Sequence, residues 1–327
     1  MRVVTYIGLV VGLGLMIALV LWQGLGEIIG LLLDFGWSLL LLPVVWAPCL
    51  VPAALSWRML FLPGREPAVS RTVHAIWIGR AINTLLATAT IGGEVVKARL
   101  LVLSGTTGAD AAASVLVDKS VQVFAIIAWG VMGVGALMLL SIETPLMVPI
   151  LVGLLALTGG VIGFVLVQRT GMLGFLIGFA GRILQSDVVG RAHAGAGEAD
   201  EVVADLYRRP GRLFLASVLK FLGLVLQVSE VWVGAYLLGL PVGFLEALMI
   251  KSLTSTLSDV AFVVPNAYGI QEGGFVLFGG MVGQPPDVML ALSLATRLRE
   301  LVIDVPGLLA WQHAEGRALF RHRKPAS

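Results

Sequence analysis

The sequence predicts an all-α polytopic membrane protein with about six full spans and two re-entrant helical hairpins. Of its 327 residues, 58% are hydrophobic and 13% are charged, and the mean hydropathy is +0.96. Soluble proteins do not have this composition. Apolar runs of about 20 residues recur along the chain, and each is long enough to cross a ~30 Å hydrocarbon layer as a helix. Two further apolar segments are interrupted by polar, glycine-marked breaks, which favour hairpins over simple spans.

Six segments have the length and composition of spanning helices. The first follows Arg2 and lacks the small-residue cleavage site of a signal peptide, so we expect it to be retained. Residues 1–320 are predicted to form one integral membrane domain, with a basic tail at 321–327. The connector at 169–212 is too short for a catalytic domain of ordinary size. The predicted spans are Val3 to Leu21, Phe35 to Trp57, about Ala109 to Leu140, Pro145 to Gln168, Leu213 to Leu240 and about Pro286 to Gln312.

Lys and Arg are distributed unevenly among the connecting segments. Arginines follow the second span, populate the connector at 169–212 and end the chain, whereas the turns at 23–34, 141–144 and 239–243 contain neither Lys nor Arg. The positive-inside rule therefore places the arginine-rich segments in the cytoplasm. We expect a multi-pass protein of the cytoplasmic membrane with both termini on the cytoplasmic side.

Two segments, Thr72 to Ser104 and Val242 to Gly283, are each long enough for two half-membrane arms. Their breaks are Ile91-Gly92-Gly93-Glu94 and the stretch from Pro265 to Gly274. The charge rule makes the first hairpin open to the cytoplasm and the second to the outside. Non-helical backbone is tolerated at membrane depth only where protein or water satisfies it, so both tips are expected to line a hydrated cavity.

The two halves at 72–140 and 242–312 are predicted to be an inverted repeat. A shift of 178 positions places Glu94 on Glu272 and Lys119 on Arg297, so each glycine-rich acidic tip is followed 25 residues later by a cation. Inverted repeats are typical of secondary transporters, whose substrate sites lie near the membrane midplane.

Sixteen charged residues, eight of each sign, fall inside the predicted membrane segments. Leaving half of them in lipid at roughly 2.5 kcal/mol each would cost about 20 kcal/mol, more than the ~5–15 kcal/mol stability of a domain. They are therefore expected to be paired or hydrated, and their balance favours a zwitterionic or polyhydroxylated headgroup. The residues are Arg80, Lys97, Arg99, Lys119, Lys220, Lys251, Arg297 and Arg299, with Glu94, Asp118, Glu230, Glu246, Asp259, Glu272, Glu300 and Asp304.

Nine polar residues in these segments are the candidate substrate contacts. Lys119 and Arg297 are expected to touch a lipid headgroup, while carboxylates hold them in place or carry protons. Buried ion pairs also act as structural links between helices, and this alternative stays open. The candidates are Arg80, Asn83, Glu94, Asp118, Lys119, Asp259, Glu272, Arg297 and Glu300.

The sequence contains no P-loop, no Gly-x-Ser-x-Gly and no His-Glu-x-x-His motif. Its four histidines and its one cysteine, Cys49, show no metal-ligand spacing. We therefore predict no catalytic residue, cofactor, metal or nucleic-acid partner, and membrane lipids are the expected partners. An integral membrane enzyme that uses buried carboxylates on a lipid headgroup stays open as an alternative, and so does a homo-oligomer.

Six stretches carry a family resemblance: Gly92 to Leu101, Ala111 to Asp118, Gly269 to Gly274, Leu292 to Glu300, Pro306 to Gln312 and Glu315 to Arg317. Through them, most of the chain resembles the flippase-like transmembrane family of lysylphosphatidylglycerol synthases. The resemblance implies a lipid translocase without the soluble lysyl-transferring domain of bifunctional relatives. The end of the last span is most similar to HpnL-type members associated with hopanoid biosynthesis, which implies a hopanoid, aminoacylated or glycosylated lipid as cargo. An accessory role beside hopanoid-pathway membrane proteins is the remaining alternative.

One departure from the family pattern concerns the second tip. Relatives commonly have Pro-Gly before it, whereas this chain has Pro265-Asn266-Ala267-Tyr268-Gly269. The resemblance therefore implies a tip of different shape.

Overall fold

The computed structural model describes residues 36–86, 91–145, 147–169, 187–261 and 264–322, together with residues 30 and 33. All regular elements in these ranges are helices, which confirms the predicted all-α class. The predicted first span, Val3 to Leu21, lies outside the described residues. Residues 170–186 of the connector and 323–327 of the tail lie outside them as well.

Within the described residues, three continuous helical rods are long and apolar enough to cross a membrane. They coincide with three of the six predicted spans. The first rod, Gly36–Arg58, comprises η1 (Gly36–Leu40), α3 (Leu41–Trp46), η2 (Ala47–Cys49) and α4 (Leu50–Arg58). The second is α7 (Gly108–Leu139), and the third, Pro210–Leu237, joins α11 (Pro210–Leu226) to α12 (Val228–Leu237).

Two more predicted spans are helical but differ from these rods. Helix α8 (Met147–Arg169) begins two residues after the predicted start at Pro145 and ends one residue past Gln168, and α15 (Pro286–His322) extends past the predicted end at Gln312. Helix α15 carries charged residues at 297, 299, 300 and 304, so it is not an uninterrupted apolar rod. The six-span topology therefore stays a prediction.

Both predicted hairpins fold back as pairs of packed helices. The first pairs α5 (Val69–Leu85) with α6 (Ile91–Leu103), and the second pairs α13 (Phe244–Val260) with α14 (Ile270–Met281); the short η3 (Pro265–Ala267) lies at the second tip. At 1.5 Å per residue, α6 and α14 are roughly 20 Å and 18 Å long. Neither arm could cross a ~30 Å hydrocarbon layer by itself.

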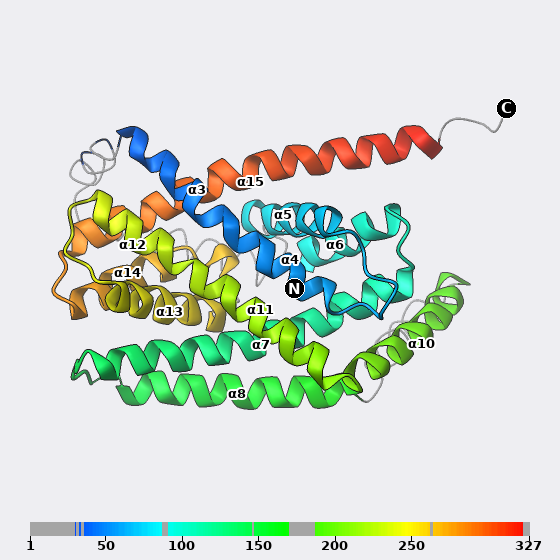
Figure 1. The fold of residues 1–327 in the computed structure, drawn as a ribbon, viewed down its shortest axis with the longest axis horizontal. Coiled ribbons are helices and arrows are strands. Elements are labelled where there is room, and N and C mark those ends of the chain that lie inside the picture. The colour runs from blue at the N-terminus through cyan, green and yellow to red at the C-terminus, as the bar shows by residue number, and fades with distance from the viewer. Residues whose placement is uncertain are drawn as a thin grey trace.

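The two hairpins open at opposite ends of the molecule, as Figure 1 shows along its long axis. At what we call the basic end, Arg71 at the start of α5 donates to the Ser104 carbonyl after α6, and Arg65 pairs with Asp110 at the start of α7. At the opposite end, Leu245 of α13 and Met281 of α14 share a hydrophobic cluster with residues that end α7 and α12.

The elements of the two halves correspond under the 178-residue shift. Applied to α6 and α7, the shift gives 269–281 and 286–317, close to the bounds of α14 and α15. Gly105 and Gly283, which the shift superposes, both have positive φ, +104° and +75°. The packing is reciprocal, because α7 packs against α13 and α15 packs against α5. The 178-residue shift places α7 on α15 and α5 on α13, so the interface between α7 and α13 corresponds to the interface between α15 and α5.

The connector contributes one long helix, α10 (Asp187–Tyr207), beside the first part of α7. Val203 and Leu206 of α10 bury against Val117 and Val121 in a second hydrophobic cluster. The Tyr207 hydroxyl donates to Ser120 Oγ at 2.9 Å. This part of the connector therefore completes the core at the basic end.

Candidate functional site

Five charged side chains from α6, α7 and α11 form what we call the first ionic network. Glu94 forms ion pairs with two lysines, with its Oε2 2.6 Å from Lys97 Nζ and its Oε1 2.7 Å from Lys119 Nζ. Asp118 also pairs with two lysines, with its Oδ2 3.3 Å from Lys97 Nζ and its Oδ1 beside Lys220 Nζ. Because each carboxylate bridges two cations, three helices are joined through charge.

The first network is buried, and it carries a surplus of positive charge. The side chain of Asp118 is 2% exposed, whereas that of Lys119 is 31% exposed. Lys97 also lies over the Trp57 ring, with its Nζ 4.8 Å from the ring centroid, a distance typical of a cation–π contact. The network contains three lysines and two carboxylates, so one positive charge is in excess. Lys119 is the most exposed of the three lysines.

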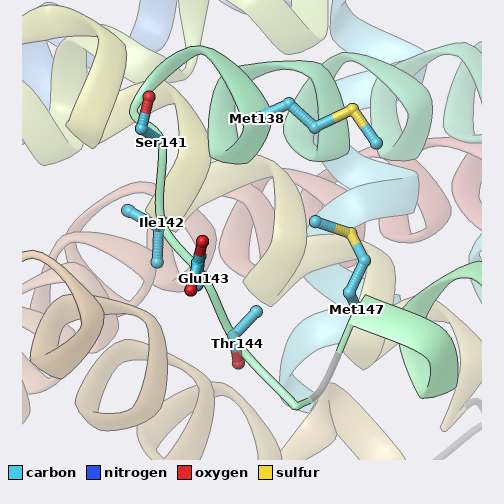
Figure 2. A pocket seen from close by; sticks show the side chains of 6 residues that line it. All are labelled: Met138, Ser141, Ile142, Glu143, Thr144 and Met147. Atoms are coloured by element: carbon cyan, nitrogen blue, oxygen red, sulfur yellow. The ribbon is translucent and has the colours of Figure 1, made fainter.

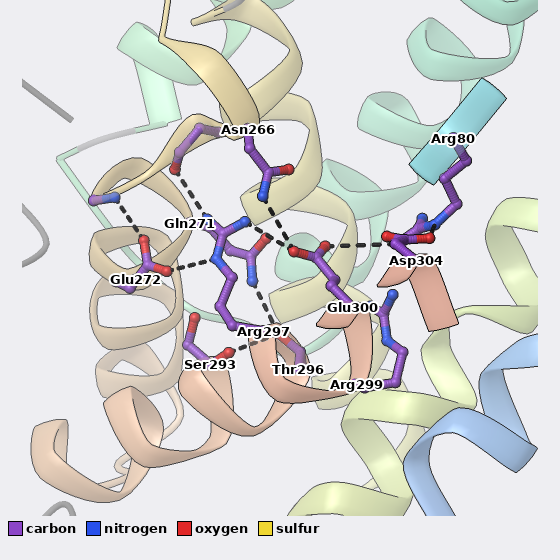
Figure 3. Close-up of polar contacts among 12 residues, drawn as sticks. Arg80, Asn266, Gln271, Glu272, Ser293, Thr296, Arg297, Arg299, Glu300 and Asp304 are labelled. Carbon is purple, nitrogen blue, oxygen red and sulfur yellow. Dashed lines mark hydrogen bonds and ion pairs between the residues drawn. The ribbon is translucent and has the colours of Figure 1, made fainter. Parts of the chain in front are cut away.

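A second ionic network joins α14, α15 and α5 (Figure 3). Arg297 Nε lies 2.8 Å from Glu272 Oε1, and Arg297 Nη1 lies 3.2 Å from Glu300 Oε2. Arg80 of α5 continues the chain of charges to Glu300 at 3.7 Å and to Asp304 at 3.1 Å. Residues 297, 300 and 304 share one face of α15, as their spacing predicts, and this face meets both hairpins.

The second tip has a backbone that positions this network. Asn266 and Ala267 have φ of +52° and +48°, and Gly269 has φ of +76°. Left-handed backbone favours Gly, and among other residues Asn tolerates it well. Asn266 can therefore adopt a positive φ at this tip, where a glycine is the usual residue. Glu272 Oε2 then accepts from the Gly269 amide at 2.7 Å, while Arg297 donates to the Ala267 carbonyl at 3.3 Å.

A third ionic network lies next to the second and was not among the predicted contacts. Arg299 donates to both oxygens of Glu230, at 2.6 and 3.0 Å, and Lys251 Nζ lies 3.5 Å from Glu230. The guanidinium of Arg299 and that of Arg80 both lie against the buried Trp46 ring, 4.5 and 4.1 Å from its centroid. Trp46 therefore connects the second and third networks. A tryptophan inside an apolar run gives no sequence signal of this role.

The structure brings together seven of the nine predicted contacts, in two groups rather than one. Glu94, Asp118 and Lys119 lie in the first network, and Arg80, Glu272, Arg297 and Glu300 lie in the second. Asp118 pairs with Lys97 and Lys220 rather than with its neighbour Lys119, because adjacent residues of a helix point about 100° apart.

The other two predicted contacts lie apart from these networks. Asn83 Oδ1 accepts from the Gly93 amide at 2.8 Å, so its side chain links the two arms of the first hairpin. Asp259 is exposed near the end of α13 and takes part in none of the ion pairs found among the described residues. The three networks also contain six charged residues outside the nine predicted contacts: Lys97, Lys220, Lys251, Arg299, Glu230 and Asp304.

A cavity of about 410 Å³ lies at the turn between α7 and α8, away from the ionic networks (Figure 2). Ser141 adopts φ of +55° at this turn. The hydrated cavity expected between the two tips stays a prediction. Among the described residues, no group of three or more His, Cys, Asp or Glu side chains is placed to hold a metal ion. The 410 Å³ cavity is lined by Met138, Ser141, Ile142, Glu143, Thr144 and Met147.

The family model of the lysylphosphatidylglycerol synthase TM region matches residues 7–307. The chain belongs to this family. The match covers both hairpins and all three ionic networks, so the whole candidate site lies within the region that defines the family. Neither the curated proteins nor the solved structures contain a match. Family membership supports a lipid-related membrane protein, whereas the HpnL-type subgroup rests on the resemblance alone.

Proposed function

We propose that this protein is a lipid translocase of the cytoplasmic membrane, with both termini in the cytoplasm. It moves the polar headgroup of a hopanoid, an aminoacylated lipid or a glycosylated lipid between leaflets. Membership of the lysylphosphatidylglycerol synthase TM-region family supports a lipid as cargo. The arginines at 65, 71 and 212 support the orientation, because they gather at one end of the molecule.

The observation that carries the proposal is the pair of equivalent salt bridges at the two hairpins. Glu94 pairs with Lys119 at 2.7 Å and Glu272 pairs with Arg297 at 2.8 Å, and each cation follows its acid by 25 residues. With hairpins that open at opposite ends and reciprocal packing of α7 and α15, this supports an inverted repeat. In such repeats, alternating access comes from movement of one repeat against the other around a central site.

In this mechanism the ion pairs keep the path closed until a headgroup replaces one partner. The side chains of Lys119 and Arg297 are 31% and 11% exposed, whereas those of Glu94 and Glu272 are 13% and 0% exposed. A headgroup with acceptor oxygens would take the place of Glu94 or Glu272 on the cation. The cost of separating a buried ion pair is then offset by new charge-assisted hydrogen bonds.

The test is a leaflet-resolved transport assay in proteoliposomes. Fluorescent aminoacylated, glycosylated and hopanoid lipids are compared for wild type, Glu272→Gln, Arg297→Ala and the control Glu246→Gln. Glu246 caps the exposed Gly243 amide at the start of α13, outside the networks. We expect Glu272→Gln and Arg297→Ala to slow transport about tenfold or more, since each removes one partner of a buried pair. The control should match wild type.

Two results would contradict the proposal. One is a wild-type protein that leaves every lipid distribution unchanged. The other is wild-type transport by both network variants after their elution profiles confirm folding. Formation of a modified lipid in detergent, where no leaflets exist, would favour the enzyme alternative instead.

A further inference from the structure

Asp259 is a carboxylate of the second hairpin that none of the three ionic networks includes. It lies one residue before the end of α13, at the second tip, and it is exposed. It forms no ion pair with any of the residues that the structure describes. An ionisable side chain inside a membrane segment is costly without a partner, and such residues mark proton relays and substrate paths.

The side of α13 that faces α7 carries Asp259. The two helices pack side by side (Figure 1). A Cβ added to Gly133 of α7 would meet Ser252 Oγ of α13. One turn along, Trp129 of α7 donates to Ser255 Oγ at 2.7 Å, so the helices are antiparallel here. Asp259 follows Ser255 by four residues, so it shares this face and falls opposite about residue 125 of α7.

Lys119 of α7 reaches toward this carboxylate. Its Nζ donates to Gln122 Oε1 at 3.2 Å, so the ammonium lies further along α7, in the direction of residue 125. Lys119 is also the charge that acts most strongly on Asp259, followed by Lys251. Leu257, which is 39% exposed, points to nearly the opposite side of α13. The acid is therefore exposed on the α7 side of the helix and not on this apolar side.

The other charged groups on the elements that pack against α13 already have partners. These elements are α7, α12, α14 and η3, and η3 contains no charged residue. Lys119 therefore stands out as the cation with which an ionised Asp259 can interact. The partnered groups are Asp110 and Asp118 of α7, Glu230 of α12, Glu272 of α14, and Glu246 and Lys251 of α13 itself.

The charge balance of the networks leaves one cation for Asp259. The second and third networks lie next to each other and together contain four cations and four carboxylates. The first network contains three lysines and two carboxylates. An ionised Asp259 balances this surplus, whereas a protonated Asp259 leaves it available to another anion. Proton binding at Asp259 and anion binding at Lys119 are therefore linked.

We propose that Asp259 is a proton site coupled to headgroup binding at Lys119. When ionised, the Asp259 carboxylate competes with the headgroup for Lys119. When a proton from water neutralises it, an anionic oxygen of the headgroup binds Lys119 instead through a charge-assisted hydrogen bond. One proton then enters with each anionic group, so the net charge of the interior does not change. The inference rests on the proposed function and adds the proton as its co-substrate.

The first experiment tests the proton site without transport. Infrared spectra of the full chain in phosphatidylcholine nanodiscs follow the C=O band that a carboxylic acid shows only when it is protonated. Wild type, Asp259→Asn, Lys119→Gln and Glu246→Gln are titrated with pH. Glu246→Gln is the matched control, because it also changes an acid to an amide on α13, outside the networks.

We expect Asp259→Asn to lose one titrating band that the control keeps. In Lys119→Gln this band should appear at higher pH, because the cation that favours the ionised carboxylate is gone. A titration that Asp259→Asn leaves unchanged would overturn the proposal, and so would a band that Lys119→Gln does not move.

The second experiment measures how transport depends on pH, with fluorescent phosphatidylglycerol as the anionic probe in proteoliposomes. The wild-type rate should fall roughly tenfold per pH unit above the midpoint of the infrared band, which is the slope for one proton. Asp259→Asn is permanently neutral and should give a flat profile. A flat wild-type profile would overturn the coupling. Absence of any lipid movement in wild type would contradict the proposed function, whereas the infrared band still decides whether Asp259 binds a proton.

Discussion

The Glu230 carboxylate offers the sharpest test of how buried charge holds this fold together. It accepts two hydrogen bonds from Arg299 and lies 3.5 Å from Lys251 Nζ. The side chains of Glu230, Arg299 and Lys251 are 0%, 3% and 13% exposed, so water cannot replace a lost partner. Glu230→Gln would therefore leave two buried cations without a carboxylate at this position.

The magnitude follows from the burial of the pair. Removing one partner of a buried ion pair costs roughly 3–5 kcal/mol, because the remaining charge stays desolvated. Equilibrium unfolding in detergent micelles, followed by tryptophan fluorescence, measures this loss for Glu230→Gln, for Arg299→Gln and for the double variant. Since the double variant removes both members, we expect a coupling free energy of about 2–3 kcal/mol between the two single changes.

Glu246→Gln is the matched control, because it makes the same change at a half-buried carboxylate that lies outside the ionic networks and caps the start of α13. Its cost should be about 1 kcal/mol or less. Additive effects of Glu230→Gln and Arg299→Gln, within roughly 0.5 kcal/mol, would refute the reasoning. A cost for Glu230→Gln no larger than that of the control would refute it as well.

Two further predictions concern the first hairpin and the basic end. Gly93→Ala should cost roughly 1–3 kcal/mol, because the new Cβ would overlap a backbone carbonyl of α5, whereas Gly108→Ala should cost nothing in the same unfolding assay because no atom lies within 4 Å. Burial raises the pKa of Glu66, but hydrogen bonds from its surroundings, including Arg212, hold that pKa below its ordinary value of 4.5. Because the pKa of Glu66 is lower in the folded protein than in the unfolded chain, the ionised carboxylate stabilises the fold at pH values above the unfolded pKa. Protection of the Gly64 amide from hydrogen exchange should therefore persist above pH 4.5 and fall as the pH drops through the folded pKa. Glu66→Gln should remove this pH dependence, and unchanged exchange in that variant would contradict it.

The hairpins were predictable because their signals are local. In each hairpin, glycine and polar residues interrupt an apolar segment that is too long for one half-membrane arm and too polar for one span. The positive-inside rule then predicts the side of the membrane on which each hairpin opens. The spacing of residues 297, 300 and 304 likewise places three charges on one face of α15. Even the departure at Asn266 was visible, although only the structure shows that it adopts left-handed φ.

The sequence by itself determined that this chain is helical, that it is lipid-related by family, and that its intramembrane charges require partners, because hydrophobicity, periodicity and the cost of buried charge are properties of short segments. Only the tertiary structure decided which residues form these ion pairs and cation–π contacts. Asp118 pairs with Lys220, Glu230 pairs with Arg299, and Trp46 lies against two arginines, because helices far apart in sequence pack side by side. Opposite charges can combine in many ways, and the packing angles of whole helices select one combination.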